Sequence, residues 1–144
     1  MHATLTKGIN FLVALLWALL LAAMLLTTRP VPMTEVSFGL LVGALAGFLQ
    51  FKAITSSPDT FVAAKTALDV RRALMAVRSG KYSIVLLWVN GLGLFIWAMA
   101  FAPNMFLGAW VAGVAAFGLA REVAAFPAIV RLGRLLKAAA PHGT

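Results

Sequence analysis

The chain has 144 residues, of which 62% are hydrophobic and 11% are charged, and its mean hydropathy is +0.98. Because a soluble domain carries roughly a quarter charged residues, this composition excludes an ordinary soluble protein and predicts an integral membrane protein. The formal net charge is +8, and the absence of cysteine excludes disulfides and thiolate metal sites.

Four uncharged runs have the length of membrane-spanning helices, which need about 20 residues, or somewhat fewer where the bilayer thins. They cover residues 9–27, 36–51, 82–101 and 104–120. The first run follows Lys7 and partly resembles a secretory signal, but the apolar region of a signal has about 7–15 residues and this run is longer. We therefore expect an all-α integral membrane protein with four transmembrane helices, the first of them retained.

The four helices are expected to form two tandem hairpins, 9–51 and 82–120, within a single membrane domain that covers residues 1–144. The first hairpin turns at a Pro-rich segment, 28–33, and the second turns at Pro103. Proline fixes its own φ angle and disfavours helix at the residue before it. Helices joined by such short connections are expected to be antiparallel neighbours.

Each hairpin is followed by a segment with the pattern of a basic amphipathic helix. Residues 58–79 begin with Pro58, which suits a first helical position, and Gly80 provides a stop signal. Residues 121–138 repeat the pattern less regularly, and Pro127 is expected to kink the last membrane helix. We expect both segments to lie on the inner leaflet or to pack against a partner.

The second hairpin resembles the first in sequence. Residues 39–52 match residues 108–121 at an offset of 69, with Gly, Val, Ala and Phe at identical positions and a Lys/Arg exchange at the last one. The Leu-Leu-Trp motif that ends at Trp17 recurs at Trp88. This similarity predicts an internal duplication whose two copies have the same orientation, related by an axis along the membrane normal. The alternative is a chance similarity, since apolar segments are built from few residue types.

The basic residues lie almost entirely on one side of the predicted helices, and Arg29 alone falls in a connection on the other side. The positive-inside rule therefore predicts a multi-pass protein of the bacterial inner (cytoplasmic) membrane with cytoplasmic N and C termini. The bacterial assignment rests on the Ala-, Leu- and Arg-rich composition. A surface for anionic inner-leaflet lipids or for a partner is expected at Arg71, Arg72, Arg78, Arg131, Arg134 and Lys137. Nucleic acid is not an expected partner, because no aromatic-interleaved basic patch accompanies these charges.

Small residues predict a close seam between the second and fourth helices, since missing side chains let two backbones approach. The expected packing residues are Gly39, Gly43, Gly47, Asn90, Gly108 and Ala112. Asn90 is expected to hydrogen-bond a neighbouring backbone, and contact with a lipid, quinone or pigment edge is the alternative. The first expected partner of this seam is the chain's own helices, followed by a second copy or another membrane protein. Trp97 and Trp110 are expected as interfacial anchors, whereas Trp17 and Trp88 lie deeper and fill packing.

Residues that carry catalysis are scarce. Glu35 and Glu122 lie at the edges of the uncharged runs, and the two histidines, His2 and His142, are terminal. No nucleophile with a nearby base and no pair of carboxylates is evident in the sequence. We expect no enzymatic activity, no cofactor and no bound metal.

Three functions are compatible with these features. The favoured one is a non-catalytic accessory, scaffolding or assembly subunit of a larger membrane complex, because small-residue seams and amphipathic segments suit docking. The second is a small oligomeric channel or transporter. A pore needs polar lining residues, and Asn90 by itself provides little of such a lining. The third is a lipid-binding, membrane-shaping protein that places basic helices on the anionic leaflet.

Overall fold

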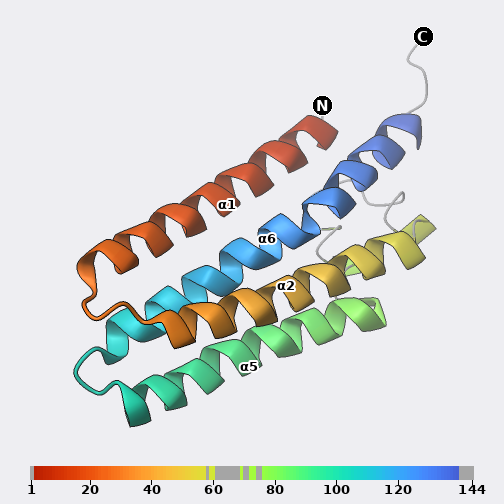
Figure 1. Ribbon diagram of the computed structural model, residues 1–144. Coiled ribbons are helices and arrows are strands. Elements are labelled where there is room, and N and C mark those ends of the chain that lie inside the picture. Colours follow the sequence, from red (N-terminus) through yellow and green to blue (C-terminus); the bar gives the residue numbers. More distant parts are fainter. Residues whose placement is uncertain (1, 58, 61–68, 70–71, 74–75, 140–144) are drawn as a thin grey trace.

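The computed structural model describes residues 2–57, 59–60, 69, 72–73 and 76–139. Helices make up nearly all of this part of the chain (Figure 1). They are α1 (His2–Thr27), α2 (Met33–Ser56), α5 (Arg78–Phe101) and α6 (Phe106–Ala139).

Each of these helices is long and apolar enough to span a membrane. The apolar segments are Gly8–Thr27, Met33–Ser56, Arg78–Phe101 and Phe106–Arg134. The prediction of an all-helical, multi-pass membrane protein with four helices of spanning length is therefore confirmed.

The helix boundaries differ from the prediction at two places. Gly80 lies buried in the first turn of α5 and does not end a preceding helix. Pro127 lies inside α6, and the segment 121–138, predicted as an amphipathic basic tail, belongs to the same helix as residues 106–120. A membrane helix tolerates an internal proline because neighbouring groups satisfy the freed backbone carbonyl. The predicted amphipathic helix 58–79 lies almost entirely outside the described residues.

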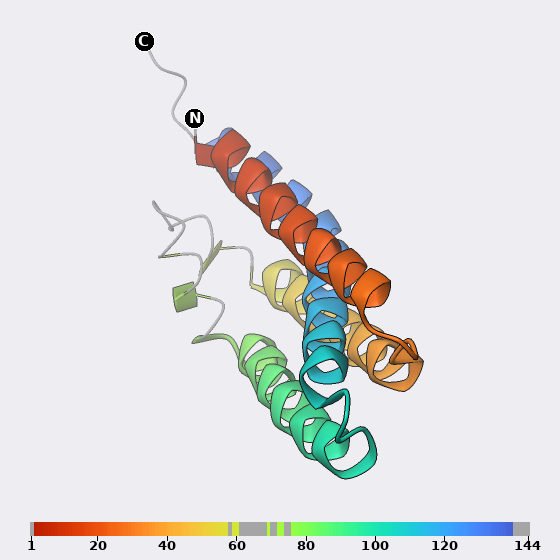
Figure 2. The same cartoon turned by 90° about the vertical axis from the view of Figure 1, so that its left-hand side faces the viewer.

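Helix α6 is the centre of the bundle. It packs against α1, α2 and α5, and α2 also packs against α5. The two short connections lie at one end of the bundle, and the N-terminus and the end of α6 lie at the other (Figure 1). Viewed from the side, α1 and α5 lie on opposite flanks of α6 (Figure 2).

The expectation that the helices of each hairpin are close neighbours holds for α5 and α6 but not for α1 and α2. Helix α1 packs chiefly against α6. The indole of Trp17 lies where a Cβ on Gly118 would be, and Thr28 lies against Gly108. Glycines of α6 pack against α1, and another face of α6 packs against the small residues of α2. Helix α6 therefore lies between the two helices of the first hairpin.

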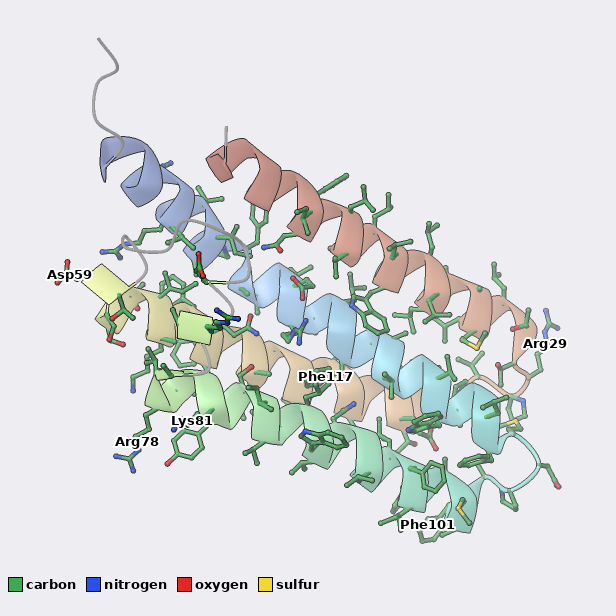
Figure 3. All side chains as sticks on the ribbon, turned by 180° about the vertical axis from the view of Figure 1, so that it is seen from behind. Arg29, Asp59, Arg78, Lys81, Phe101 and Phe117 are labelled. Atoms are coloured by element: carbon green, nitrogen blue, oxygen red, sulfur yellow. The ribbon has the colours of Figure 1, made fainter. Side chains whose placement is uncertain are left out.

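The core follows α6 and consists largely of small residues. The fully buried alanines of α6 include Ala109, Ala112, Ala115, Ala116 and Ala128. Phe117 is the largest fully buried side chain and packs with Val42 and Ala46 of α2; Figure 3 shows it within the bundle. Large apolar side chains such as Phe11 and Ile96 face outward. This distribution is that of a bundle surrounded by lipid hydrocarbon.

Candidate functional site

The glycines of α2 lie where this helix runs beside α6. They are Gly39, Gly43 and Gly47. A Cβ on Gly39 would overlap the backbone carbonyl of Gly113, and a Cβ on Gly43 would overlap the backbone of Phe117. A Cβ on Gly47 would lie 2.6 Å from the Cβ of Ala124. The two backbones therefore approach one another at distances that only glycine permits on the α2 side.

The small residues expected on α6 divide between two neighbours. Ala112 is fully buried in a cluster with Val36 of α2. Gly108 instead faces α1, because a Cβ there would lie 2.9 Å from the Oγ1 of Thr28. Helix α6 meets Gly39 of α2 through Gly113, a residue that was not among the predicted packing residues. The signal in the sequence for this contact was that Gly113 is a glycine within an apolar run.

Asn90 lies on the inward face of α5 and has no exposed surface. Neither its Oδ1 nor its Nδ2 has a hydrogen-bond partner among the described residues. The interhelical hydrogen bond predicted for this side chain is absent, so the prediction was wrong on that point. The bundle encloses the amide, which therefore presents no surface to a lipid, quinone or pigment. An unsatisfied buried amide costs about 1–3 kcal/mol.

The four tryptophans have different surroundings. Trp110 of α6 donates a hydrogen bond from its indole nitrogen to the carbonyl oxygen of Gly91 on α5. Trp97 packs against Phe101 with the ring centroids 4.1 Å apart and the ring planes tilted by 34°. Trp17 packs against α6, whereas the equivalent Trp88 is 65% exposed on the surface of α5.

Two carboxylates are buried in the bundle. Glu122 forms an ion pair with Arg121, with 2.6 Å between Oε1 and Nη2. Glu35 is 6% exposed and makes no hydrogen bond or ion pair with the described part of the chain. It lies in the first turn of α2, where the positive end of the helix dipole stabilises its negative charge. The sequence placed Glu35 at the membrane edge, and its burial follows from the packing of α2 against α6.

A groove between α2 and α5 lies beside Glu35. Its volume is about 290 Å³, and its lining consists of Thr34, Glu35, Phe38, Gly93, Leu94 and Trp97. Leu94 is 2% exposed and forms part of the inner wall, whereas Phe38 and Trp97 are each about two-fifths exposed at the rim. The surface of the groove is thus almost entirely apolar, with aromatic and aliphatic walls. No local sequence pattern brings these residues together, because their meeting depends on how α2 packs against α5.

The basic residues gather at the end of the bundle opposite the two short connections. The exposed side chains of the predicted surface are Arg72, Arg78, Arg131 and Arg134. Arg78 donates from Nε to the hydroxyl of Tyr82 at 3.2 Å and lies over its ring. Figure 3 shows Arg78 and Arg29 at opposite ends of the bundle. Arg71 and the side chain of Lys137 lie outside the described part of the structure.

Within the described residues, no three His, Cys, Asp or Glu side chains are close enough together to hold a metal ion. The buried features with chemical interest are therefore the Asn90 amide and the groove beside Glu35. Comparison with known proteins gave no match: no family matches this sequence, and no curated protein and no solved structure is similar to it.

Proposed function

We propose that this protein is a non-catalytic accessory or assembly subunit of a larger membrane complex and that it docks through the outward face of α5. The exposure of Trp88 carries the proposal. This side chain is 65% exposed near the middle of α5. Tryptophan favours the membrane–water interface over the hydrocarbon centre, and it is enriched at the centres of protein interfaces. A neighbouring protein helix is therefore a better environment for Trp88 than lipid chains.

The surface around Trp88 is suitable for an apolar transmembrane helix. Val85, Leu92 and Ile96 are all exposed and lie at helical spacing from Trp88 on one face of α5. Trp17, the matching residue of the first half, packs against Gly118 of the same chain. The comparison supports a docking role for the uncovered tryptophan, because its counterpart already has a protein partner.

Native mass spectrometry after gentle extraction from the source membrane tests this function. We expect a stoichiometric larger complex for the wild-type chain and its loss in Trp88→Ala. Phe11→Ala is the matched control, because Phe11 is also an aromatic residue that is 65% exposed, but on α1. A wild-type protein that always runs alone contradicts the proposal, as does equal loss of the complex in both variants.

A small oligomeric transporter is the second candidate, and the buried polar residues favour it. Glu35, Ser83, Asn90 and Glu122 are all buried inside the bundle. Asn90 is near the middle of α5 and lacks a partner among the described residues. In a conformation that opens the bundle, a hydrogen bond to a permeating species would compensate its desolvation. Flux in protein-only liposomes that disappears in Asn90→Leu supports transport, and absence of flux in the wild type opposes it.

We further propose that the bundle lies in a bacterial inner membrane with both termini in the cytoplasm. The support is the position of exposed basic residues, with Arg78, Lys81 and Arg131 at the end that carries the termini and Arg29 at the other. Cytoplasmic ends of membrane helices carry an excess of Lys and Arg.

The two halves of the chain are, in our proposal, copies of one hairpin. The first helix of each half packs against the second helix of the other half: α1 against α6, and α5 against α2. Exchange of the two halves would interconvert these contacts. Along the α2–α6 seam, Gly39 meets Gly113 and Gly43 meets Phe117, a pairing five residues beyond the sequence match, so the two copies are staggered.

A further inference from the structure

Two basic side chains lie together near the start of α5. Arg78 and Lys81 are both exposed, and residues three apart on a helix are neighbours on its surface. Figure 3 shows the two at the same end of the bundle, opposite Arg29. The first turn of α5 contains no acidic residue, and neither side chain forms an ion pair with the described residues. Their two positive charges are therefore uncompensated within the described part of the chain.

The guanidinium group of Arg78 is held in place by Tyr82. Its Nε donates a hydrogen bond to the Tyr82 hydroxyl, with 3.2 Å between the two atoms, and its Cζ lies 5.9 Å from the centroid of the ring. This hydrogen bond uses Nε alone, so the terminal Nη1 and Nη2 groups retain their donors for another acceptor. A guanidinium that is already oriented loses less side-chain freedom when it binds an anion.

The length of α5 places the two basic residues at the level of the lipid head groups. The helical rise from Tyr82 to Phe101 is about 29 Å, and the hydrocarbon core of a bilayer is about 30 Å thick. Tyrosine is enriched at the boundary between the hydrocarbon and the head groups. Because Arg78 and Lys81 precede Tyr82, they lie just outside the hydrocarbon, where the phosphate groups of the lipids are found.

We infer that Arg78 and Lys81 bind the phosphate group of an anionic phospholipid, with Tyr82 orienting the guanidinium. This site goes beyond the docking role proposed for α5, because Trp88 lies about 15 Å further along the helix from Arg78. It is also independent of the orientation of the bundle, since the group that is recognised is the phosphate itself.

The chemistry of the two side chains favours an anionic lipid over a zwitterionic one. A guanidinium can donate two parallel hydrogen bonds to the oxygen atoms of one phosphate. Lys81 adds a second positive charge beside the first. A choline head group would bring its own cation close to Lys81, whereas a glycerol head group carries no positive charge. Phosphatidylglycerol is therefore expected to bind more tightly than phosphatidylcholine.

The test uses the full-length protein in dodecyl maltoside micelles, and native mass spectrometry measures the lipid that each protein retains. Phosphatidylglycerol is the anionic probe, and phosphatidylcholine with the same acyl chains is the reference without net charge. We expect the dissociation constant of the first phosphatidylglycerol to rise about fivefold in Arg78→Gln and in Lys81→Gln, an effect typical of one basic residue beside anionic lipid. Retention of phosphatidylcholine should not change. A wild-type affinity for phosphatidylglycerol in both variants overturns the inference.

Arg134→Gln is the matched control, because it removes one exposed positive charge from the same end of the bundle. Leu132 of α6 packs in a cluster with Val77, the residue that precedes Arg78. Arg134 follows Leu132 by two residues and therefore lies on the other side of α6. We expect Arg134→Gln to bind phosphatidylglycerol as the wild type does. An equal loss in Arg134→Gln would show a diffuse attraction to the basic end and would contradict a site on α5.

Arg78→Lys separates an oriented guanidinium from a simple positive charge. The variant keeps the charge but has neither the planar fork nor the Nε that bonds Tyr82. We expect the dissociation constant for phosphatidylglycerol to rise about threefold, because a paired hydrogen bond to phosphate is lost. Arg134→Lys should have no effect. Unchanged affinity in Arg78→Lys contradicts a site built on the guanidinium.

Inorganic phosphate distinguishes a lipid head group from a soluble anion. An excess of inorganic phosphate should leave phosphatidylglycerol bound, because the acyl chains hold the lipid in the micelle beside the protein. Release of phosphatidylglycerol by millimolar phosphate would assign Arg78 and Lys81 to a soluble anion and overturn the inference.

Discussion

Trp110 of α6 donates a hydrogen bond from Nε1 to the backbone carbonyl oxygen of Gly91 on α5, with 3.0 Å between the two atoms. The indole also meets the ring of Phe95 edge to face at a centroid distance of 5.6 Å. A membrane interior contains no water to satisfy the indole N–H, so this bond matters more than a similar one at a protein surface. The Trp110 hydrogen bond links α5 to α6, whereas the side chain of Asn90 on α5 forms no hydrogen bond with the described residues.

Trp110→Phe removes this hydrogen bond and keeps an aromatic ring against Phe95. We expect the free energy of unfolding to fall by about 0.6–2 kcal/mol, the range for interhelical hydrogen bonds in membranes. Reversible unfolding in mixed micelles with increasing dodecyl sulfate measures the change. Trp97→Phe is the control, because no hydrogen bond from Trp97 is found in the described structure and an aromatic contact with Phe101 is retained. Equal losses in both variants would show that the bond is energetically neutral.

Gly43→Ala places a methyl group on the backbone of Phe117. We expect α2 and α6 to separate locally and the free energy of unfolding to fall by about 1–3 kcal/mol, as for other overpacked cores. Gly43→Leu should disrupt the seam completely. Gly93→Ala, where a Cβ meets no atom within 4 Å, should be neutral or stabilising by up to about 1 kcal/mol. The same unfolding assay distinguishes them, and a fully stable Gly43→Leu protein would refute the seam.

Asn90→Leu replaces an enclosed amide by an apolar side chain of similar size. Because both polar atoms of Asn90 lack partners among the described residues, we expect the variant to be more stable by about 1 kcal/mol or more. Asn90→Asp should be less stable, since a carboxylate is harder to bury than an amide. Thermal aggregation in detergent gives the order of the three proteins. If Asn90→Leu is the least stable, the amide has a partner such as a bound water.

The absence of native cysteine makes single-cysteine labelling a clean test of orientation. Asn104 lies exposed in the connection between α5 and α6, and Asp59 lies exposed near the opposite end. For cytoplasmic termini, a membrane-impermeant maleimide added to intact cells should label Asn104→Cys and not Asp59→Cys. Labelling of both after cell disruption controls for accessibility. The reverse pattern would show that the termini lie outside.

The candidate groove was visible in the sequence only in fragments. Glu35 was evident as an acid at the start of an apolar run, and Trp97 as an aromatic residue near the end of another. Their meeting with Phe38 requires α2 and α5 to pack side by side, although these helices belong to different halves of the chain. No local pattern encodes that pairing, because both helices are apolar around most of their circumference.

The sequence by itself determined the number of spanning helices and the end of the bundle at which the short connections lie. Uncharged runs of sufficient length must satisfy their backbone groups as helices in a membrane, and a connection of a few residues cannot cross it. Only the tertiary structure decided that α6 lies between α1 and α2 and that Asn90 and Glu35 are enclosed. The physical reason is that lipid chains are as apolar as the helix surfaces, so the choice of neighbour depends on shape. The close contacts of Trp17 with Gly118 and of Gly43 with Phe117 determine that α6 packs against both α1 and α2.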